Sequence, residues 1–435
     1  ISVGELHIRP VLNLKDPEDV RKFREIARDT AKLTRKYRGS LSGELGDGRV
    51  RGEFIPIIIG AANYEILKEI KHTWDPDNVF NAGKIIDTPP MDSSLRYLPG
   101  KPSREIKTIF DFSESGGIQR MAEKCNGSGD CRKSALIGGT MCPSFMATRD
   151  EQTSTRARAN ILREFLNTSE KNNPFDHEEI YEVLDLCLSC KGCKSECPSN
   201  VDMAKMKAEF LQQYYDLHRI PLRAWVIANI AGIQKVGMAI PGLFNFFISQ
   251  KLLSKGLKRI LGFASSRSIP PLGRKTLRKW IRQNLDRLNS EIEQVNGKIC
   301  LFVDEFTNYN DTAVGIKAIR LLQMLGYQVV TSRHDVSGRT FLSKGLLRKA
   351  RSIAERNVSI LAELVTEDVP LVGLEPSAIL GFRDEYPELV NREMATDATK
   401  LAANALTLEE FLVRELDRGH IQKDMFTREK RQIKL

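Results

Sequence analysis

The sequence predicts a multidomain protein that combines α+β and α/β folds. A chain of 435 residues is too long for one hydrophobic core, so we expect several domains. Seven of the eight cysteines lie between positions 125 and 197, which predicts a separate cysteine-bearing domain. Strand-like apolar runs alternate with helical patterns near the C-terminus, which predicts a parallel sheet. The expected domains span residues 1–90, 91–219, 220–297 and 298–435.

The first domain is predicted to be an α+β piece. Residues 6–14 alternate between apolar and polar side chains, as a strand does. Asp16 and Pro17 then predict the start of a helix, which Gly39 ends. A second helix is expected over residues 56–72.

A proline-rich linker separates this piece from the cysteine-bearing region. The prolines are Pro89, Pro90, Pro99 and Pro102. Helical patterns follow over residues 153–167, 175–187 and 200–217. We therefore expect a mostly helical domain in which loops between helices carry the cysteines.

The connector over residues 220–297 is apolar at first and basic later. Lys235 and Pro241 divide the apolar stretch from Trp225 to Ile248 into pieces too short to span a membrane. Two interpretations remain: a pair of core-packing helices, which is favoured, and an interfacial surface near a quinone-bearing membrane. We therefore expect a cytoplasmic protein, with peripheral contact at the inner face of the membrane as the alternative.

The basic part of the connector holds eleven Lys or Arg over residues 251–287 against one acid, Asp286. Phe263 and Trp280 are its two aromatic residues, and no nucleic-acid-binding motif accompanies it. A solvated basic face is therefore favoured over a nucleic-acid-binding module, and no nucleic-acid partner is predicted.

The last domain begins with an apolar strand over residues 299–303. A helix is expected from Asp311, followed by strands over 327–330 and 369–374. This βαβ pattern predicts an α/β domain with a parallel sheet. Cys300 lies inside the first strand and is expected to be a small buried hydrophobe.

The spacing Cys187, Cys190, Cys193, Cys197-Pro198 carries most of the chemistry. C-x2-C-x2-C-x3-C-P is the pattern of thiolates that hold iron–sulfur clusters. Zinc is the alternative, but zinc sites usually pair two C-x2-C knuckles across a long gap. The run therefore predicts one or two [4Fe-4S] clusters and electron transfer.

A second ligand set lies upstream, because the cysteine before the proline usually ligates the other cluster. The upstream candidates are Cys125, Cys131 and Cys142, the last followed by Pro143. We assign Cys142 to the cluster of Cys187, Cys190 and Cys193, and Cys125, Cys131 and Cys197 to the other site. That second site would need a non-cysteine ligand or hold three irons.

Further motifs give a family resemblance. They are the runs Gly4–Pro10, Ser42–Gly48, Asp75–Lys84 and Thr153–Asn160. With the cysteine motif, they resemble fused FAD-binding and iron–sulfur-binding oxidoreductases of the D-lactate and D-2-hydroxyglutarate dehydrogenase type. Residues 1–90 resemble the C-terminal part of the FAD-linked oxidase cap, and 298–435 the start of a cysteine-rich domain. Residues 91–219 resemble the dicluster domain, which implies a mostly helical, ferredoxin-like fold.

The resemblance implies several site residues. His7 and Glu44 correspond to ligands of a divalent metal, zinc or iron, and a further histidine ligand would fall just before Ile1. Arg9 corresponds to a residue that contacts the substrate, and a guanidinium can pair with a carboxylate. Asn81 and Lys84 resemble the flavin-side motif.

Two departures from the family pattern affect the expected activity. Leu45 replaces the histidine base of the family and cannot accept a proton. In the last domain, Val336, Ser337 and Gly338 replace a Cys-Cys-Gly motif, so no further cluster is expected there.

The expected function is that of a part of a flavin-dependent D-2-hydroxy-acid dehydrogenase. FAD would be bound mainly by a domain that precedes these residues, or by a separate subunit, and the clusters would carry electrons to a quinone or a carrier protein. Lys191 and Arg132 are expected to favour cluster reduction. The alternative is a non-catalytic electron-transfer subunit paired with a separate flavoprotein, and an oligomer is expected in either case.

Overall fold

The computed structural model describes residues 4, 6–102, 104–427 and 429. The chain divides into two compact units, Ile1–Glu105 and Ile106–Leu435. Each unit is described by itself.

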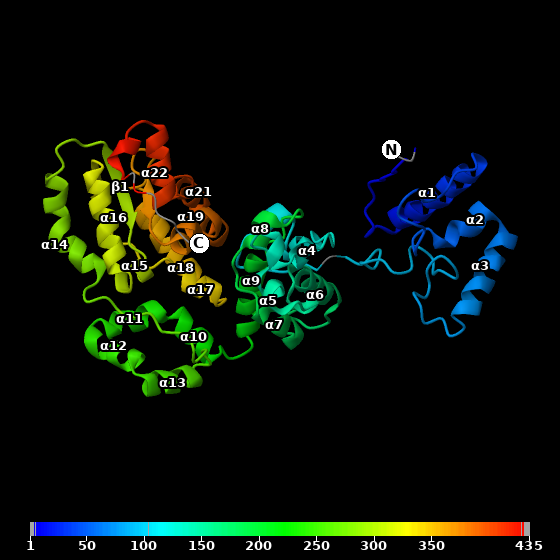
Figure 1. The fold of residues 1–435 in the computed structure, drawn as a ribbon, viewed down its shortest axis with the longest axis horizontal. Coiled ribbons are helices and arrows are strands. Elements are labelled where there is room, and N and C mark those ends of the chain that lie inside the picture. Colours follow the sequence, from blue (N-terminus) through cyan, green and yellow to red (C-terminus); the bar gives the residue numbers. More distant parts are fainter. Residues whose placement is uncertain (1–3, 5, 103, 428, 430–435) are drawn as a thin grey trace. The chain divides into compact units, whose positions relative to one another are not determined.

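The first unit is built from α1 (Pro17–Lys36), α2 (Ile55–Ile59) and α3 (Ala61–Trp74), the blue helices of Figure 1. Helix α1 begins where predicted, because the Asp16 carboxylate accepts the Glu18 N–H at 2.8 Å. The helix predicted over 56–72 is instead two helices. Gly60, at φ 83°, takes a backbone conformation that interrupts a right-handed helix.

The prediction of a strand over residues 6–14 is wrong, and with it the α+β fold of the first piece. These residues run without regular structure until Asn13, and the described part of residues 4–105 contains no strand. An alternating pattern becomes a strand only where a neighbouring strand satisfies its backbone groups. The described part of the first unit offers no such neighbour.

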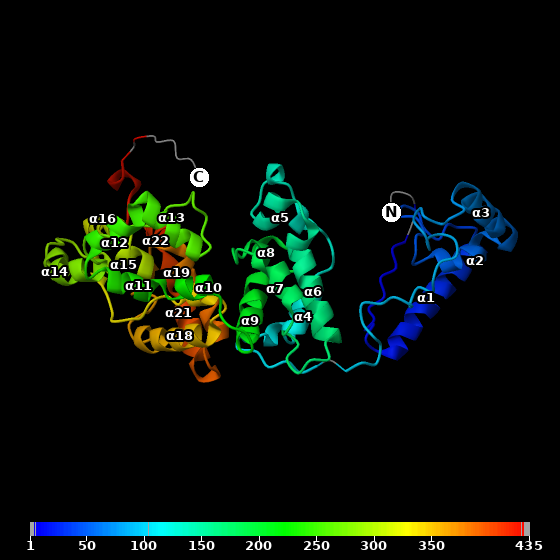
Figure 2. The same ribbon diagram turned by 90° about the horizontal axis from the view of Figure 1, so that it is seen from below.

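The cysteine-bearing part of the second unit is helical, as predicted, and appears in cyan and green in Figures 1 and 2. Its helices are α4 (Ile118–Glu123), α5 (Pro143–Thr148), α6 (Thr155–Thr168), α7 (Glu178–Asp185), α8 (Gly192–Glu196) and α9 (Met203–Tyr215). The cysteines lie in the segments between these helices, except Cys193, which lies in α8. Buried side chains of α6 and α9 form its centre.

The connector is also helical. It contains α10 (Leu222–Ala228), α11 (Ile230–Gly237), α12 (Pro241–Ser249), α13 (Lys251–Ile260) and α14 (Leu277–Ser290). Among the described residues, no single helix is long and apolar enough to cross a membrane. The pair α11 and α12 meets that length and composition only when taken together, and it is bent by 118°.

The C-terminal part contains the predicted parallel sheet. Strands β1 (Gly297–Phe302), β2 (Tyr327–Val330), β3 (Leu371–Gly373) and β4 (Ala405–Thr407) lie in the order β2-β1-β3-β4, all parallel. The surrounding helices are α15 (Glu305–Tyr309), α16 (Thr312–Met324), α17 (Arg339–Ser343), α18 (Leu347–Leu361), α19 (Pro376–Asp384), α20 (Tyr386–Leu389), α21 (Ala395–Ala403) and α22 (Leu408–Asp417).

Strand β1 has two buried faces, because successive side chains of a strand point in opposite directions. Ile299 and Leu301 pack with side chains of α14, α16 and α22. Cys300 and Phe302 belong to the core that continues through α18 and α19 to the cysteine-bearing helices. Cys300 is fully buried, as predicted, and this continuous core fixes the cysteine loops against the sheet domain.

Candidate functional site

The loop before α8 presents three of the predicted cysteine ligands. Cys187 and Cys190 lie in this loop, and Cys193 lies in the first turn of α8. Ser189 and Lys191, on either side of Cys190, have φ values of 54° and 63°. This left-handed backbone curls the loop back on itself between the cysteines.

Glu196 connects a distant segment to this loop. Its carboxylate accepts hydrogen bonds from the N–H and hydroxyl of Thr140, both at 2.6 Å, and from the Met141 N–H at 3.2 Å. Cys142 is the next residue and immediately precedes α5. The carboxylate therefore holds Cys142 beside α8, although the two segments lie about 50 residues apart in the chain.

Two glycines permit this close approach. A Cβ atom on Gly192 would lie 2.8 Å from the Thr140 hydroxyl oxygen and 3.3 Å from the Thr140 carbonyl carbon. A Cβ atom on Gly139 would lie 2.7 Å from a Glu196 carboxylate oxygen. The segment before Cys142 therefore packs directly on the backbone of α8.

The result is a pocket lined by Cys142, Cys187, Cys190 and Cys193. All four are free thiols. The residues that the structure describes include no group of three His, Cys, Asp or Glu side chains that could hold a single metal ion. A [4Fe-4S] cluster makes a different demand, since each thiolate binds a separate iron and the ligands surround the core. The predicted first ligand set therefore surrounds one pocket.

Arg158 in α6 also lines this pocket, and its side chain is only 1% exposed. One guanidinium nitrogen lies 3.5 Å from the Cys142 sulfur, and Nε donates to the Val183 carbonyl at 3.0 Å. The remaining nitrogen, Nη2, has no hydrogen-bond partner. A buried cation with an unused donor suits an anionic group in the pocket, so these residues fit an iron–sulfur cluster with its thiolates.

The thiols of the pocket differ in acidity. Burial acts to raise the pKa of Cys142, but hydrogen bonds from Ser144 and the Phe145 N–H, with the charge of Arg158, outweigh it and lower the pKa. Burial raises the pKa of Cys193 to about 12. Cys142 is therefore the more easily ionised ligand, whereas Cys193 requires metal binding to lose its proton.

The two cations that were predicted to favour cluster reduction, Lys191 and Arg132, are each paired with a carboxylate. Lys191 pairs with Asp384 and with Glu385 at 2.8 Å, and Arg132 pairs with Glu151 at 2.9 Å, so carboxylates compensate both charges. Two other cations near the pocket, Arg158 and Lys207, were not singled out from the sequence.

Lys207 in α9 is buried, and its ammonium donates to the Cys187 carbonyl at 2.7 Å and to the Asp185 carbonyl at 3.2 Å. Burial lowers its pKa to about 8. The one sequence signal for Arg158 was its position in the Thr153–Asn160 run. No sequence signal indicated Lys207, because only the packing of the folded chain turns this side chain inward.

The second predicted ligand set is partly brought together. The Cys131 thiol interacts electrostatically with Cys125 and Cys142, and burial raises its pKa. Its sulfur accepts a hydrogen bond from the Arg156 N–H at 3.4 Å, at the N-terminal end of α6, where a helix favours negative charge. The assignment of Cys197 to this set stays a prediction.

The site residues of the first unit lie on its surface. His7, Arg9, Glu44 and Leu45 are exposed. The metal site expected at His7 and Glu44 stays a prediction, as does the substrate contact of Arg9.

The flavin-side motif has a defined local structure. The Lys84 ammonium donates to the Asn81 side chain at 3.0 Å. Buried Asp75 accepts the N–H groups of Val79 and Phe80, at 2.8 and 2.9 Å. The turn is therefore shaped by its own side chains, and the flavin contact expected of Asn81 and Lys84 stays a prediction.

Two protein-family models match separate parts of the chain. Residues 1–85 match the model of the FAD linked oxidases, C-terminal domain, and residues 124–202 match the 4Fe-4S dicluster domain. These matches support FAD and [4Fe-4S] clusters as cofactors. No solved structure matches the chain significantly.

Individual relatives cover most of the chain. D-2-hydroxyglutarate dehydrogenase of Escherichia coli (strain K12) is 28% identical over 436 residues, which cover 90% of this chain and 42% of that protein. The protein of the same name from Pseudomonas putida is 29% identical over 438 residues, with the same two shares. The chain thus spans less than half the length of these relatives. The resemblance to fused FAD-binding and iron–sulfur-binding oxidoreductases of the D-2-hydroxyglutarate dehydrogenase type is confirmed.

A shorter relative matches about half of the chain. It is a subunit of the anaerobic glycerol-3-phosphate dehydrogenase of Escherichia coli (strain K12). The two sequences are 27% identical over 207 residues, which cover 47% of this chain and 50% of that relative.

Proposed function

We propose that this chain is the electron-conducting part of a flavin- and iron–sulfur-dependent D-2-hydroxy-acid dehydrogenase. The substrate class is D-2-hydroxyglutarate or D-lactate, which the enzyme would oxidise to a 2-oxo acid. The observation that carries the proposal is the position of Cys142. It lines one pocket with Cys187, Cys190 and Cys193, beside the unused donor of Arg158.

The chemistry divides between cofactor and protein. Bound FAD supplies the acceptor for the hydride that leaves C2 of the substrate, while the hydroxyl proton leaves to a base. Leu45 cannot accept that proton, so the base is another group. Arg9 would hold the substrate carboxylate.

Electrons would then leave singly through the cysteine pocket. Cys142 and Cys193 form its buried side, whereas Cys190 is exposed. A donor or acceptor can approach closely only on the exposed side, so we assign the electron entry or exit to Cys190. The acceptor is proposed to be a quinone or a carrier protein, with peripheral membrane contact and an oligomeric assembly.

Anaerobic preparation of the full chain tests the proposal. Iron, acid-labile sulfide and the electron paramagnetic resonance signal of the dithionite-reduced protein should show at least one [4Fe-4S] cluster. Cys142→Ser should lose the signal of the cluster that this residue holds, whereas Cys300→Ser, which changes a buried cysteine in β1, should retain it. Absence of iron and sulfide from the unaltered protein would refute the proposal.

A second candidate is an electron-transfer subunit that works beside a separate flavoprotein. The match to a protein named as a dehydrogenase subunit, over about half of its length, favours this candidate. The two differ in where FAD resides. If FAD copurifies on another polypeptide, the subunit is supported; if it resides on a longer form of this chain, the fused enzyme is supported.

A further inference from the structure

Helix α13 has its polar and apolar sides reversed relative to an ordinary surface helix. Ser254 and Lys258, one turn apart, are only 4% and 8% exposed. Leu252 and Ile260 are 86% and 73% exposed. A surface helix in water normally turns its leucines inward, so the outer side of α13 needs an apolar environment.

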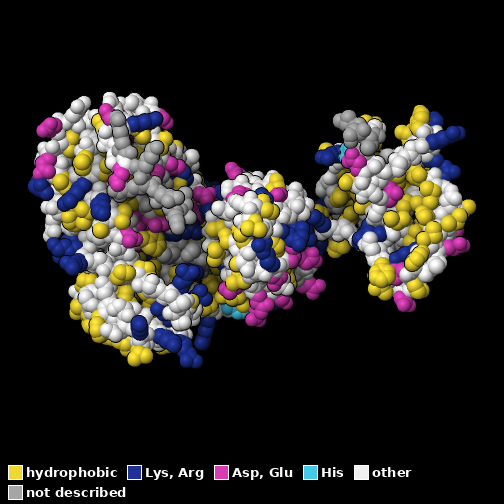
Figure 3. Space-filling view, viewed as in Figure 1, with side chains coloured by type: hydrophobic (Ala, Val, Ile, Leu, Met, Phe, Trp, Pro, Cys, Tyr) yellow, Lys and Arg dark blue, Asp and Glu magenta, His cyan; other side chains and the backbone are white. Residues whose placement is uncertain are grey.

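The apolar surface continues over the neighbouring helix. Phe246 and Phe247 of α12 are about half exposed, as is Leu243, and Ile240 before α12 is more so. Figure 3 shows hydrophobic and basic side chains gathered over the part of the second unit formed by α11–α13. Soluble chains seldom leave such a contiguous apolar surface uncovered.

The charge of this region indicates what covers it. No Asp or Glu occurs between Asp216 and Asp286, a stretch that contains thirteen Lys or Arg. A second copy of the chain would bring the same positive charge and be repelled. An anionic lipid surface attracts it, by about 1 kcal/mol for each basic residue near the membrane.

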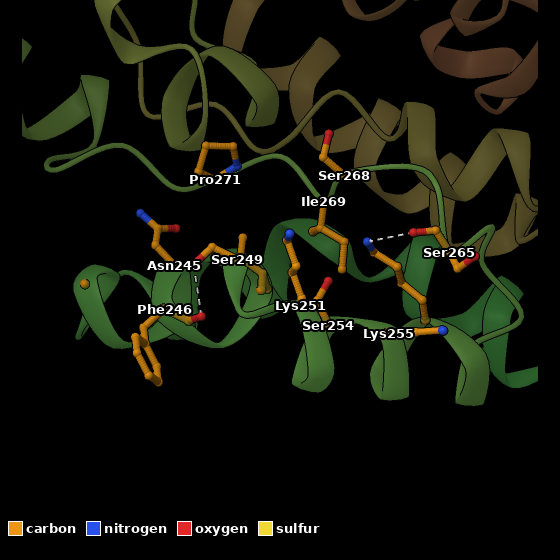
Figure 4. A pocket seen from close by; sticks show the side chains of 13 residues that line it. Asn245, Phe246, Ser249, Lys251, Ser254, Lys255, Ser265, Ser268, Ile269 and Pro271 are labelled. Carbon is orange, nitrogen blue, oxygen red and sulfur yellow. Dashed lines mark hydrogen bonds between the residues drawn. The ribbon is translucent and has the colours of Figure 1, made fainter.

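A pocket lies on the inner side of α13, between α12, α13 and residues 265–271 (Figure 4). Its volume is about 580 Å³, and its polar lining includes Lys251, Lys255 and Lys258 with Ser249 and Ser254. The Ser254 hydroxyl is buried and has no hydrogen-bond partner. An unsatisfied hydroxyl in a pocket that lysine side chains also line suits a phosphate group, which would accept its hydrogen bond.

We propose that α12 and α13 dock onto an anionic phospholipid bilayer, with Leu252 and Ile260 inserted at the boundary of the acyl chains. A helix in this position buries its apolar side by about 5–10 Å, which leaves its opposite side at the depth of the head groups. The pocket around Ser254 then takes a lipid phosphate. This inference rests on the peripheral membrane contact proposed above and assigns it to particular residues.

Sedimentation with vesicles tests the docking surface. The full chain, prepared anaerobically and assayed for iron, is mixed at low salt with vesicles of phosphatidylglycerol and phosphatidylcholine, or of phosphatidylcholine alone. The unaltered protein should bind the anionic vesicles only. Combined Leu252→Gln and Ile260→Gln should weaken that binding at least about tenfold. Met324→Gln, which changes a side chain of α16 that is 85% exposed, should leave binding unchanged.

Ser254→Ala tests the pocket separately. The variant removes a hydroxyl that no protein group uses, so thermal unfolding should be unaltered, but the preference for phosphatidylglycerol should fall several-fold. Equal binding to both vesicle types would overturn the proposal, as would unchanged binding by the Leu252 and Ile260 variant. Binding of inorganic phosphate or self-association without vesicle binding would also overturn it. Absent vesicle binding with normal iron content contradicts the docking surface alone, whereas absent iron contradicts the proposed function.

Discussion

Arg158 places a buried positive charge against the sulfur of Cys142. The charge is balanced by no carboxylate that the structure places beside it, and one of its donors remains unused. A positive charge next to a cluster stabilises the reduced form, which carries one more electron. Arg158 is therefore a positioning and tuning residue for the cluster.

Arg158→Gln should lower the midpoint potential of the cluster held by Cys142. We expect a shift on the order of 50 mV, where 59 mV corresponds to tenfold in a one-electron equilibrium. A redox titration followed by electron paramagnetic resonance measures it. Arg158→Lys keeps the charge and should restore most of the potential, whereas a purely structural residue would affect cluster content and leave the potential unaltered.

At the scale of elements, the site depends on contact between the segment before α5 and the backbone of α8. The cysteine spacing predicted Cys187, Cys190 and Cys193 as neighbours, and the Cys-Pro rule added Cys142. The cap at Asp16 predicted the start of α1, and the helical pattern over residues 153–167 predicted α6 to within two residues, because both signals are local. The contacts of Glu196 and Arg158 join residues distant in sequence, so no local pattern indicated them.

Gly192→Ala should disturb the site by steric conflict. The added methyl group would meet Thr140 at 2.8 Å and push the segment that carries Cys142 away from α8. We expect a loss of about 1–3 kcal/mol in the free energy of unfolding and a lower iron content. Urea unfolding and iron analysis measure both.

Gly232→Ala in α11 is the matched control, since its methyl group would meet no atom within 4 Å. It should be neutral or stabilise the protein by up to about 1 kcal/mol, as alanine is the better helix former. Equal iron content in the two variants would contradict the role assigned to the contact.

At the scale of the whole molecule, the second unit holds its own N-terminal segment in place. The Glu209 carboxylate of α9 accepts the N–H groups of Ile109 and Phe110, both near 3.0 Å. In contrast, the strand predicted over residues 6–14 does not form, because its backbone groups have no neighbouring strand within the described first unit. The second unit should therefore retain its structure when the first is removed.

Brief trypsin digestion of the full protein should cleave after exposed Arg104, at the boundary between the units. The fragment that begins at Glu105 should keep its iron through gel filtration, because all seven clustered cysteines follow that point. Mass spectrometry and iron analysis of the separated fragments provide the measurement. Release of iron on cleavage would show that the first unit supports the clusters.

Lys207 gives the electron path a sensitivity to acidity. Its pKa of about 8 means that the ammonium beside Cys187 is charged below that pH and neutral above it. The midpoint potential should therefore fall as pH rises through about 8, and Lys207→Met should remove this slope. Because linkage is reciprocal, an arriving electron would raise the pKa of Lys207 and draw in a proton. Above about pH 8, where Lys207 is neutral before reduction, each electron would then enter with a proton, and the added charge in the interior would be compensated.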